Sequence, residues 1–235
     1  MIVSENSTQL LSPHAALLKR NDREAERNRA LFHSKNLLVL NMLSSPGSGK
    51  TRLLERTLSD LGARLRFGVI VGDLQTDNDA RRLSGRGAPV VPITTGTVCH
   101  LESAMIARAV EQLDLDALDV LVIENVGNLV CPARFDLGED FRIVLFSTTE
   151  GEDKPLKYPL MFKTADVVLL NKIDLAEAVD FDSVSAKANL AGVAPQATVL
   201  SVSARTGAGL PEWYQWLEER VATKRVNRSE ATVRR

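Results

Sequence analysis

The chain has 235 residues, of which 44% are hydrophobic and 25% are charged, with a formal net charge of −1 at neutral pH. This composition is typical of a globular protein with a buried core, and the small net charge excludes binding to nucleic acid or to a membrane by bulk electrostatic attraction. No apolar stretch approaches the roughly 20 residues of a membrane span and no secretory signal is evident, so we expect a cytoplasmic protein whose two cysteines stay reduced.

Residues 1–36 are predicted to form an N-terminal extension that precedes the main domain. Within it, the segment 17–32 is rich in charge and carries only a thin apolar stripe, which is typical of a surface helix packed on a domain. An arm for dimerisation or for binding a partner is the alternative interpretation.

Apolar runs of strand length recur along residues 37–223 and alternate with helix-like segments. Continuous Val, Ile and Leu runs are typical of strands buried on both faces, so the pattern predicts one three-layer α/β domain with a mostly parallel sheet and helices on both faces. Apolar residues at helical spacing also predict a covering helix over 101–113. The strand-like runs are 37–43, 67–72, 119–124, 141–147, 166–171 and 197–202.

The first predicted strand leads into a loop of small residues and then into a helix, which is the arrangement of a P-loop NTPase fold. The loop ends in GSGKT, although Ser44 stands where the full pattern has its first glycine. Backbone N–H groups would surround the phosphates, with Lys50 at the β- and γ-phosphates and the Thr51 hydroxyl on Mg²⁺. A Gly/Ser turn that binds no nucleotide is the alternative. The candidates for nucleotide contact here are Gly47, Ser48, Gly49, Lys50, Thr51 and Arg52.

The segment LLNKIDL, which ends the fifth predicted strand, indicates the base. Asp174 can accept hydrogen bonds from the ring N–H and the exocyclic amine of guanine, whereas adenine lacks that amine. Asn171 would tie this segment to the phosphate loop, and the aliphatic part of Lys172 would lie along the purine. Backbone groups of Ser203 and Ala204 would approach the base oxygen. The combined pattern predicts binding of GTP and GDP.

Two acidic residues at strand ends complete the predicted phosphate chemistry. Asp73 and Glu124 can each hold Mg²⁺ through water, and Asp73 is our preferred candidate for orienting the attacking water. Lys50, Asp73 and Glu124 are therefore the predicted catalytic set for hydrolysis of GTP to GDP and phosphate. No arginine finger is evident, so we expect slow intrinsic turnover. For Asp77 and Asp79, capping of a helix N-terminus is at least as good an interpretation as a chemical role.

Cys99 and His100 are adjacent in a chain with only two cysteines and three histidines. We place them just before or within the first turn of the helix predicted at 101–113, where a thiolate is favoured. The second cysteine, Cys131, follows the strand at 119–124, in a loop that senses the γ-phosphate in many GTPases.

Two thiols and an imidazole suit Zn²⁺ or Ni²⁺. Three protein ligands do not close a tetrahedral site, and a twofold dimer would supply more. Inert buried thiols are the alternative, because a separation of 32 positions between the cysteines is not a metal-binding signature. His14 and His33 are expected to be exposed.

The motifs of this chain resemble those of one family. SSPGSGKT, GDLQTDND, TTGTVCHLESAM, ENVGNLVCPARFDLGE and NKIDL are similar to segments of the GTPases that deliver nickel to [NiFe] hydrogenase during its maturation. The resemblance extends over about residues 21–217 and implies a P-loop GTPase of the SIMIBI group that dimerises when GTP binds. It further implies that Cys99, His100 and Cys131 hold Ni²⁺ or Zn²⁺ at the dimer interface, and that nickel passes to a partner maturation protein and the hydrogenase large subunit.

The chain lacks one feature of the family, and other interpretations of its motifs are possible. Many members carry an N-terminal cysteine-rich or histidine-rich stretch, but no cysteine precedes Cys99 here, so storage of several nickel ions is not expected. The urease nickel-delivery GTPase is a competing interpretation, although it has Cys-Pro-His instead of Cys-His. A GTPase chaperone for cobalamin-dependent mutases and a non-catalytic metal-binding protein are further alternatives. Residues 224–235 are predicted to be a flexible basic tail.

Overall fold

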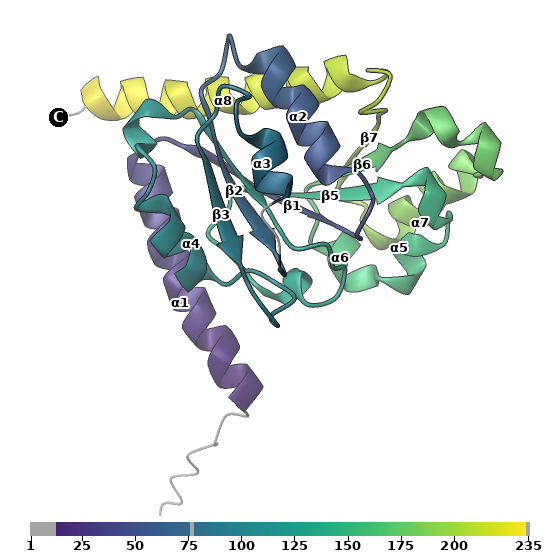
Figure 1. Cartoon of the computed structure of the whole chain (residues 1–235), viewed down its shortest axis with the longest axis horizontal. Coiled ribbons are helices and arrows are strands. Elements are labelled where there is room, and N and C mark those ends of the chain that lie inside the picture. Colours follow the sequence, from purple (N-terminus) through teal and green to yellow (C-terminus); the bar gives the residue numbers. More distant parts are fainter. Residues whose placement is uncertain (1–12, 76–77, 234–235) are drawn as a thin grey trace, which may run out of the picture.

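The computed structural model describes residues 13–75 and 78–233, in which a seven-stranded sheet is enclosed by helices (Figure 1). Residues 1–12, which include most of the segment where a secretory signal would lie, and Asp77 are outside the described residues. The strands follow the order β3-β2-β4-β1-β5-β6-β7, and every neighbouring pair is parallel. The prediction of an α/β fold with a mostly parallel sheet is confirmed. The strands are β1 (Leu38–Ser44), β2 (Phe67–Asp73), β3 (Val90–Thr94), β4 (Val120–Glu124), β5 (Phe141–Ser147), β6 (Val167–Asn171) and β7 (Thr198–Ser201).

Six of these strands coincide with the predicted runs, whereas β3 was not predicted. It forms an edge of the sheet, its residues alternate between more and less buried positions, and it contains Pro92. An edge strand tolerates proline because the N–H on its outer side needs no ladder partner. Such a strand therefore lacks the continuous apolar run by which the buried strands are recognised.

The helices cover both faces of the sheet. Side chains of α2, α3 and α8 pack in one core with alternate strand residues, while α1, α4, α6 and α7 pack on the opposite face. Because α8 continues to Val233, residues 224–233, which we assigned to the basic tail, belong to this helix. The helices are α1 (Pro13–Ser34), α2 (Lys50–Leu61), α3 (Asn78–Leu83), α4 (Ser103–Val110), α5 (Lys154–Lys157), α6 (Pro159–Lys163), α7 (Ser183–Val193) and α8 (Leu210–Val233).

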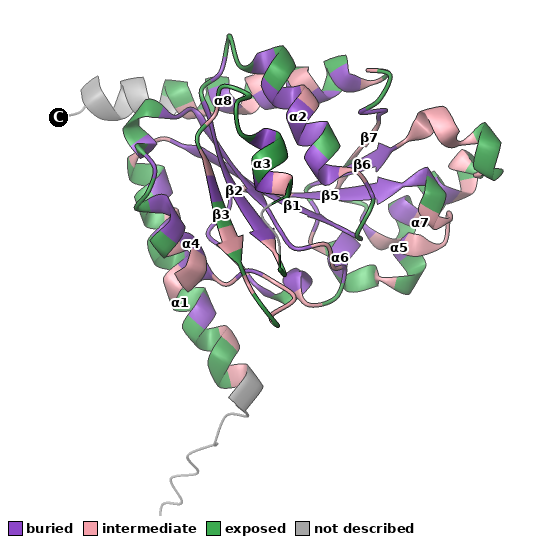
Figure 2. Ribbon diagram, viewed as in Figure 1, coloured by how far each residue is buried: buried purple, intermediate pink, exposed green. Residues whose placement is uncertain are grey.

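Alternation along β1 shows how one strand serves both cores. Leu38, Leu40 and Met42 pack toward α2 and α8, whereas Val39 and Leu43 pack on the other face. The central strands are accordingly buried throughout (Figure 2). Each fully buried aliphatic side chain contributes about 1.5–3 kcal/mol, so the sheet is a rigid platform.

The N-terminal helix α1 lies along α4 (Figure 1). Ala25 and Phe32 on its inner face are buried, while most of its charged residues face outward. Among the helices that the structure describes, none is both long and apolar enough to traverse a lipid bilayer.

Because all strands are parallel, their carboxyl ends lie at the same end of the sheet, where ligands bind in open α/β folds. Asp73, Glu124 and Asn171 are the last residues of β2, β4 and β6. Ser44 ends β1 beside them. The fold thus brings these residues, which sequence reasoning selected from distant segments, to the carboxyl end of the sheet.

Candidate functional site

The phosphate loop connects β1 to α2, and helix α2 begins at Lys50. Gly49 has φ 99°, and a Cβ at this position would lie 2.6 Å from Asn171 Nδ2. Only glycine allows this positive φ and this close approach. The first N–H groups of α2 therefore stand next to the loop without a side chain between them, as an anion site requires.

Lys50 is buried at the base of this loop. Its ammonium group donates a hydrogen bond to Ser44 Oγ at 2.7 Å. Burial lowers the pKa of Lys50, while the nearby Glu124 carboxylate acts in the opposite direction. Ser44, the position at which the chain departs from the usual pattern, thus provides a polar partner for the lysine, a role that the sequence did not reveal.

Thr51, which follows Lys50, forms a hydrogen bond with Glu124. The Thr51 hydroxyl donates to Glu124 Oε1 at 2.7 Å. Burial raises the pKa of Glu124 to about 7. Its second oxygen, Oε2, is buried and has no hydrogen-bond partner in the part of the chain that the structure describes. A buried, unpartnered carboxylate oxygen next to a hydroxyl fits a hydrated divalent cation.

A pocket of about 460 Å³ opens over these groups. Asp73 lies on its wall, as does Asp79 from the first turn of α3, where it pairs with Arg82. The pocket is lined by Pro46, Gly47, Gly49, Lys50, Thr51, Arg52, Gly72, Asp73, Leu74, Asp79, Arg82, Glu124, Val126 and Gly127. The structure therefore brings Lys50, Thr51, Asp73 and Glu124 together, as the sequence predicted.

A second pocket of about 350 Å³ adjoins the phosphate loop and is lined by Asn171, Lys172 and Asp174 of the NKID segment. Asn171 Nδ2 donates to Ser48 O at 2.9 Å, which is the predicted tie between this segment and the phosphate loop. Lys172 Nζ reaches Gly47 O at 2.7 Å. This pocket is lined by Gly49, Arg52, Asn171, Lys172, Asp174, Leu175, Ala204 and Arg205.

The Asp174 carboxylate accepts hydrogen bonds from Ser203 Oγ and, at 2.8 Å, from Arg205 Nε. The hydrogen bond from Ser203 is the main cause that lowers the pKa of Asp174. The carboxylate is therefore an ionised acceptor at neutral pH. Arg205 was not among the predicted residues, because a mostly exposed arginine in a turn carries no sequence signal of its own.

Ser203 and Ala204 lie in the turn that follows β7 and also make contacts within the chain. The Ser203 N–H donates to Ala208 O at 2.8 Å, and the Ala204 N–H donates to Asn171 Oδ1 at 3.2 Å. Both backbone donors thus maintain the turn that follows β7, and Ser203 meets Asp174 through its hydroxyl.

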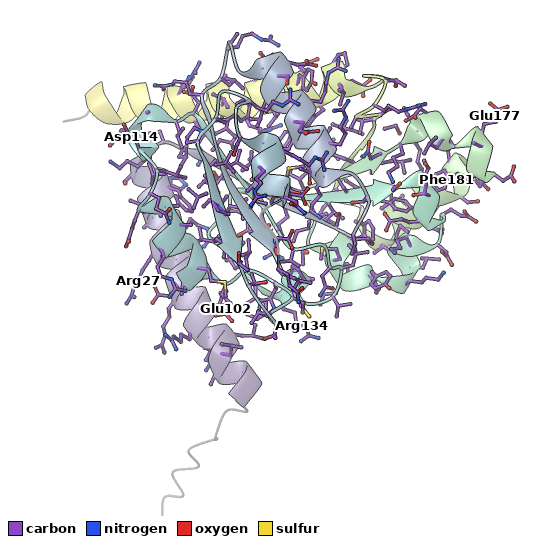
Figure 3. All side chains as sticks on the ribbon, viewed as in Figure 1. Arg27, Glu102, Asp114, Arg134, Glu177 and Phe181 are labelled. Atoms are coloured by element: carbon purple, nitrogen blue, oxygen red, sulfur yellow. The ribbon has the colours of Figure 1, made fainter. Side chains whose placement is uncertain are left out.

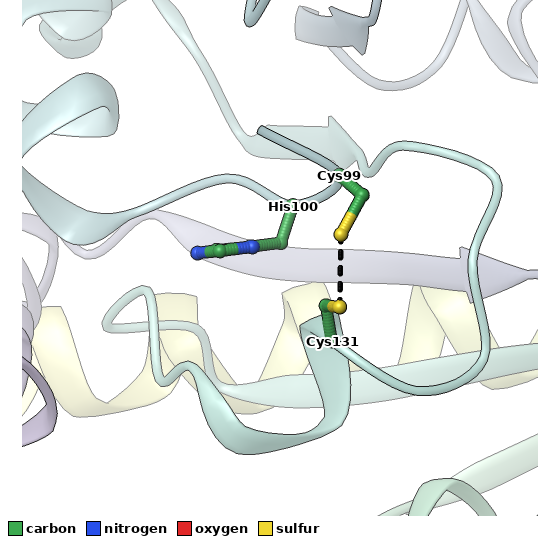
Figure 4. A group of neighbouring side chains, drawn as sticks. All are labelled: Cys99, His100 and Cys131. Atoms are coloured by element: carbon green, nitrogen blue, oxygen red, sulfur yellow. Dashed lines mark hydrogen bonds between the residues drawn. The ribbon is translucent and has the colours of Figure 1, made fainter. Parts of the chain in front are cut away.

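Cys99, His100 and Cys131 form a cluster in which the side chains of the two cysteines point toward each other (Figure 4). One donor atom from each lies within 4.8 Å of the others, and the two sulfur atoms are 2.8 Å apart. Two thiolates on one tetrahedral ion would be separated by about 3.8 Å, given Zn–S bonds of about 2.3 Å. Binding of a metal therefore requires the two sulfurs to move apart by about 1 Å.

The position of the Cys-His pair relative to α4 decides between the two places that the sequence allowed. Helix α4 begins at Ser103, with Glu102 as its N-cap, so Cys99 and His100 precede the helix instead of lying in its first turn. Proximity to the helix N-terminus therefore does not account for thiolate character. Instead, the hydrogen bond with Cys99 raises the pKa of Cys131, which is the behaviour of two thiols facing each other.

His100 is oriented by stacking on Phe135, with ring centroids 3.8 Å apart. Neither of its ring nitrogens has a hydrogen-bond partner among the described residues, and the Glu102 carboxylate is 3.7 Å from Nε2. Burial lowers the pKa of His100, so the imidazole is neutral at neutral pH and can ligate a metal. In contrast, His33 is exposed as predicted, and the side chain of His14 lies outside the described residues.

Two asparagines that sequence reasoning missed connect the two sites. Asn125, next to Glu124, accepts a hydrogen bond from the Leu101 N–H at 3.3 Å. Asn128 donates to Cys99 O at 3.3 Å. Glu102 and Arg134, which flank the metal-binding residues in sequence, lie at the same end of the molecule (Figure 3). The loop after β4 therefore runs from the phosphate pocket to the Cys-His cluster and contacts both.

Comparisons with known proteins agree with this geometry. Residues 38–201 match the family described as CobW/HypB/UreG, nucleotide-binding domain. The hydrogenase maturation factor HypB of Azotobacter vinelandii is 50% identical over 219 residues, which are 93% of this chain and 72% of that protein. The crystal structure of HypB from Helicobacter pylori in complex with nickel superposes with a TM-score of 0.83 at 42% identity, covering 88% of this chain and 96% of that one.

More distant similarity is restricted to the fold. The signal recognition particle receptor FtsY from Elizabethkingia anophelis, solved in complex with GDP, gives a TM-score of 0.50 at 12% identity over 82% of this chain and 74% of that chain. The hydrogenase maturation relatives are instead 50% and 42% identical to this chain. This chain belongs to the CobW/HypB/UreG family of P-loop GTPases, among its HypB hydrogenase maturation factors.

Proposed function

We propose that this protein is a GTP-hydrolysing metallochaperone that carries nickel on Cys99, His100 and Cys131 for [NiFe] hydrogenase maturation. One observation carries the proposal: a single loop starts at Glu124 in the phosphate pocket and ends at Cys131 in the Cys-His cluster. A change at the phosphate end of so short a loop alters the position of the sulfur at its other end.

The nucleotide site supports GTP as the substrate. Lys50 would leave Ser44 for the β- and γ-phosphates, and Asp174 would receive the guanine N–H groups. Thr51 and Glu124 would hold Mg²⁺, with Asp73 on the opposite wall orienting the attacking water. Mg²⁺ supplies charge neutralisation at the phosphates when bound. The remaining catalytic work is positioning and electrostatic stabilisation by these side chains.

The metal site supports a transition-metal cargo. Two thiols and a neutral imidazole are soft or borderline ligands that select Ni²⁺ or Zn²⁺ over Mg²⁺. Because these thiols must stay reduced, we place the protein in the cytoplasm. The nickel-bound relative from Helicobacter pylori favours nickel as the cargo.

Three ligands leave the coordination sphere incomplete, which supports a homodimer in the GTP-bound state. Val130, next to Cys131, is 58% exposed, and Leu160 of α6 is also exposed. These apolar side chains would be covered by the second protomer. Transfer to a partner maturation protein and the hydrogenase large subunit would follow hydrolysis, when the dimer loosens. The hydrogenase maturation relatives favour this target over urease.

Lys50→Ala is expected to reduce phosphate release from GTP by about 100-fold or more, because it removes the cation at the phosphates. Multiple-turnover release of inorganic phosphate measures this effect. Lys187→Ala, an exposed lysine on α7, is the matched control. Wild-type protein that binds GTP but releases no phosphate would instead support the alternative of a non-catalytic metal-binding protein.

Metal affinity is expected to differ between nucleotide states, because Glu124 and Cys131 share a loop. Coupling of this kind typically changes affinity by about 5- to 150-fold, and the metal must change the affinity for the nucleotide by the same factor. Chelator competition for Ni²⁺ with GDP and with a non-hydrolysable GTP analogue measures it, and sedimentation of the same samples reports the monomer–dimer equilibrium. Equal affinities in both states would contradict a GTP-controlled carrier.

A further inference from the structure

We infer that helix α1 is a brace that fixes the distance between the two metal-binding loops, and that Asn21 and Asn28 are positioning residues for the metal site. The inference rests on the proposed metal site and adds an element that supports its geometry beside the direct contacts between the two loops. It concerns the loop that carries Cys99 and His100 and the loop that follows Cys131.

Asn28 bridges the two loops with a single amide. Its Nδ2 donates to Ser103 O at 2.9 Å and to Leu137 O at 3.1 Å. The residue is only 3% exposed. Both hydrogens of one NH₂ group are therefore used, one on Ser103, the first residue of α4 after the Cys-His loop, and one on the loop after Cys131.

Asn21 makes the same connection two turns earlier on α1. Its Oδ1 accepts from the Ser103 N–H at 2.9 Å, and its Nδ2 donates to Asp136 O at 2.7 Å. Arg29 Nη2 adds hydrogen bonds to both oxygens of the Asp136 carboxylate, at 2.8 and 2.7 Å. Helix α1 therefore holds one loop at Ser103, where that loop enters α4, and the other at Asp136, and the two anchors cannot move apart independently.

These anchors are close to the metal ligands. Ser103 is three residues after His100, and the intervening Leu101 is fully buried. Asp136 is five residues after Cys131 and directly follows Phe135, on which the His100 ring stacks. A displacement of either anchor would therefore change the orientation of His100 and the separation of the two sulfurs.

Helix α1 packs closely against the loop that follows Cys131, at Gly138. Gly138 has φ 89°, and a Cβ there would lie 2.7 Å from Ala25 O and 2.8 Å from Arg29 N. Backbone therefore packs directly on backbone, which a loop resting loosely on a helix does not require.

The sequence of α1 is unusual for a helix that merely covers a surface. Asn21 and Asn28 share the inner face with Ala25 and Phe32, at the spacing of successive helical turns. Asparagine is a poor helix former, and a buried amide is costly unless it is fully hydrogen-bonded. Apolar residues at these two positions would pack the helix, but they would not join the two loops.

The test compares Asn28→Ala, Asn21→Ala and the double variant with wild type. The matched control is Arg27→Ala, an exposed α1 residue (Figure 3) whose side chain pairs only with Glu24 among the described residues. We expect Zn²⁺ affinity, measured by chelator competition, to fall about 10-fold in each single variant and about 100-fold in the double one, as for other outer-shell partners. GDP affinity should remain within about twofold of wild type, because no nucleotide contact is changed.

A second measurement needs no metal. Diamide oxidises Cys99 and Cys131 of the metal-free protein to a disulfide, and the rate depends on how often the sulfurs meet. We expect slower cross-linking in the Asn variants than in Arg27→Ala. Variants that bind Zn²⁺ and cross-link like wild type, with only a lower melting temperature, would overturn the brace.

The two proposals fail in different ways. If wild type binds no Zn²⁺, the metal site is wrong, while the cross-linking rates still test the brace. If Asn28→Ala does not fold, the combined Asn21→Ala and Arg29→Ala variant replaces it, because it removes both the hydrogen bond to Asp136 O and the ion pair with the Asp136 carboxylate. Unchanged Zn²⁺ affinity and unchanged cross-linking in that variant would then overturn the brace.

Discussion

Cys131→Ala is expected to lower the affinity for Ni²⁺ and Zn²⁺ by at least about 100-fold, the upper end of the effects seen for outer-shell partners alone. The change removes one of three ligands and leaves Cys99 and His100, which together cannot hold a transition metal tightly. Cys99→Ala should have the same consequence, because the two sulfurs face each other at 2.8 Å. Competition with a chromophoric chelator measures both variants.

His33→Ala is the matched control for ligand loss, since this histidine is exposed on α1 and is not part of the cluster. GTP hydrolysis measured on the same preparations shows whether each variant is folded, because the phosphate and guanine contacts come from other segments. Unchanged metal stoichiometry in both cysteine variants would contradict the site assignment and would support the alternative that the two thiols are inert.

Asp174→Asn is expected to weaken GTP binding by more than about 100-fold. Two hydrogen bonds to a charged acceptor contribute about 1.5–3 kcal/mol each, and an amide presents an N–H₂ group where the guanine amine needs an acceptor. The same amide can donate to the 2-oxo group of xanthine, so affinity for xanthosine triphosphate should rise. Competition binding with the two nucleotides gives the ratio directly.

Arg205 provides a control for this experiment. Its Nε donates to Asp174 Oδ2, one of the two carboxylate oxygens, but Arg205 has no acceptor with which to select guanine. Arg205→Ala should therefore leave the preference for guanine over xanthine intact, whatever it does to affinity. Retained guanine preference in Asp174→Asn would contradict the assigned role of this carboxylate.

Much of the nucleotide site could be predicted because its residues lie in short segments with fixed local geometry. Lys50 and Thr51 follow a glycine at a strand–helix junction, and Asp174 follows a buried strand, so local sequence specifies their places. The partners Ser44, Arg205 and Asn125 could not be predicted in the same way. Each acts through a contact with a residue distant in sequence or through an ordinary polar side chain that has no pattern.

The covering helix and the edge strand show the same limit. Apolar spacing extended the helix at 101–113 beyond α4 because Leu101 and Leu113 are buried without being helical. The sequence therefore left open whether Cys99 and His100 precede the helix or lie in its first turn, and they precede it. Strand β3 was missed because an edge strand is only half buried and tolerates proline.

By itself, the sequence determined the parallel α/β fold, the guanine nucleotide site and the identity of the three metal-ligand candidates. These features depend on periodicity and on short motifs, which are local properties of the chain. Only the tertiary structure decided that Cys99 faces Cys131 across 32 positions, that the loop after β4 joins the two sites, and that Asn21 and Asn28 hold both metal loops. Such contacts join segments whose proximity is set by packing of the whole sheet and its helices, so no local pattern contains them.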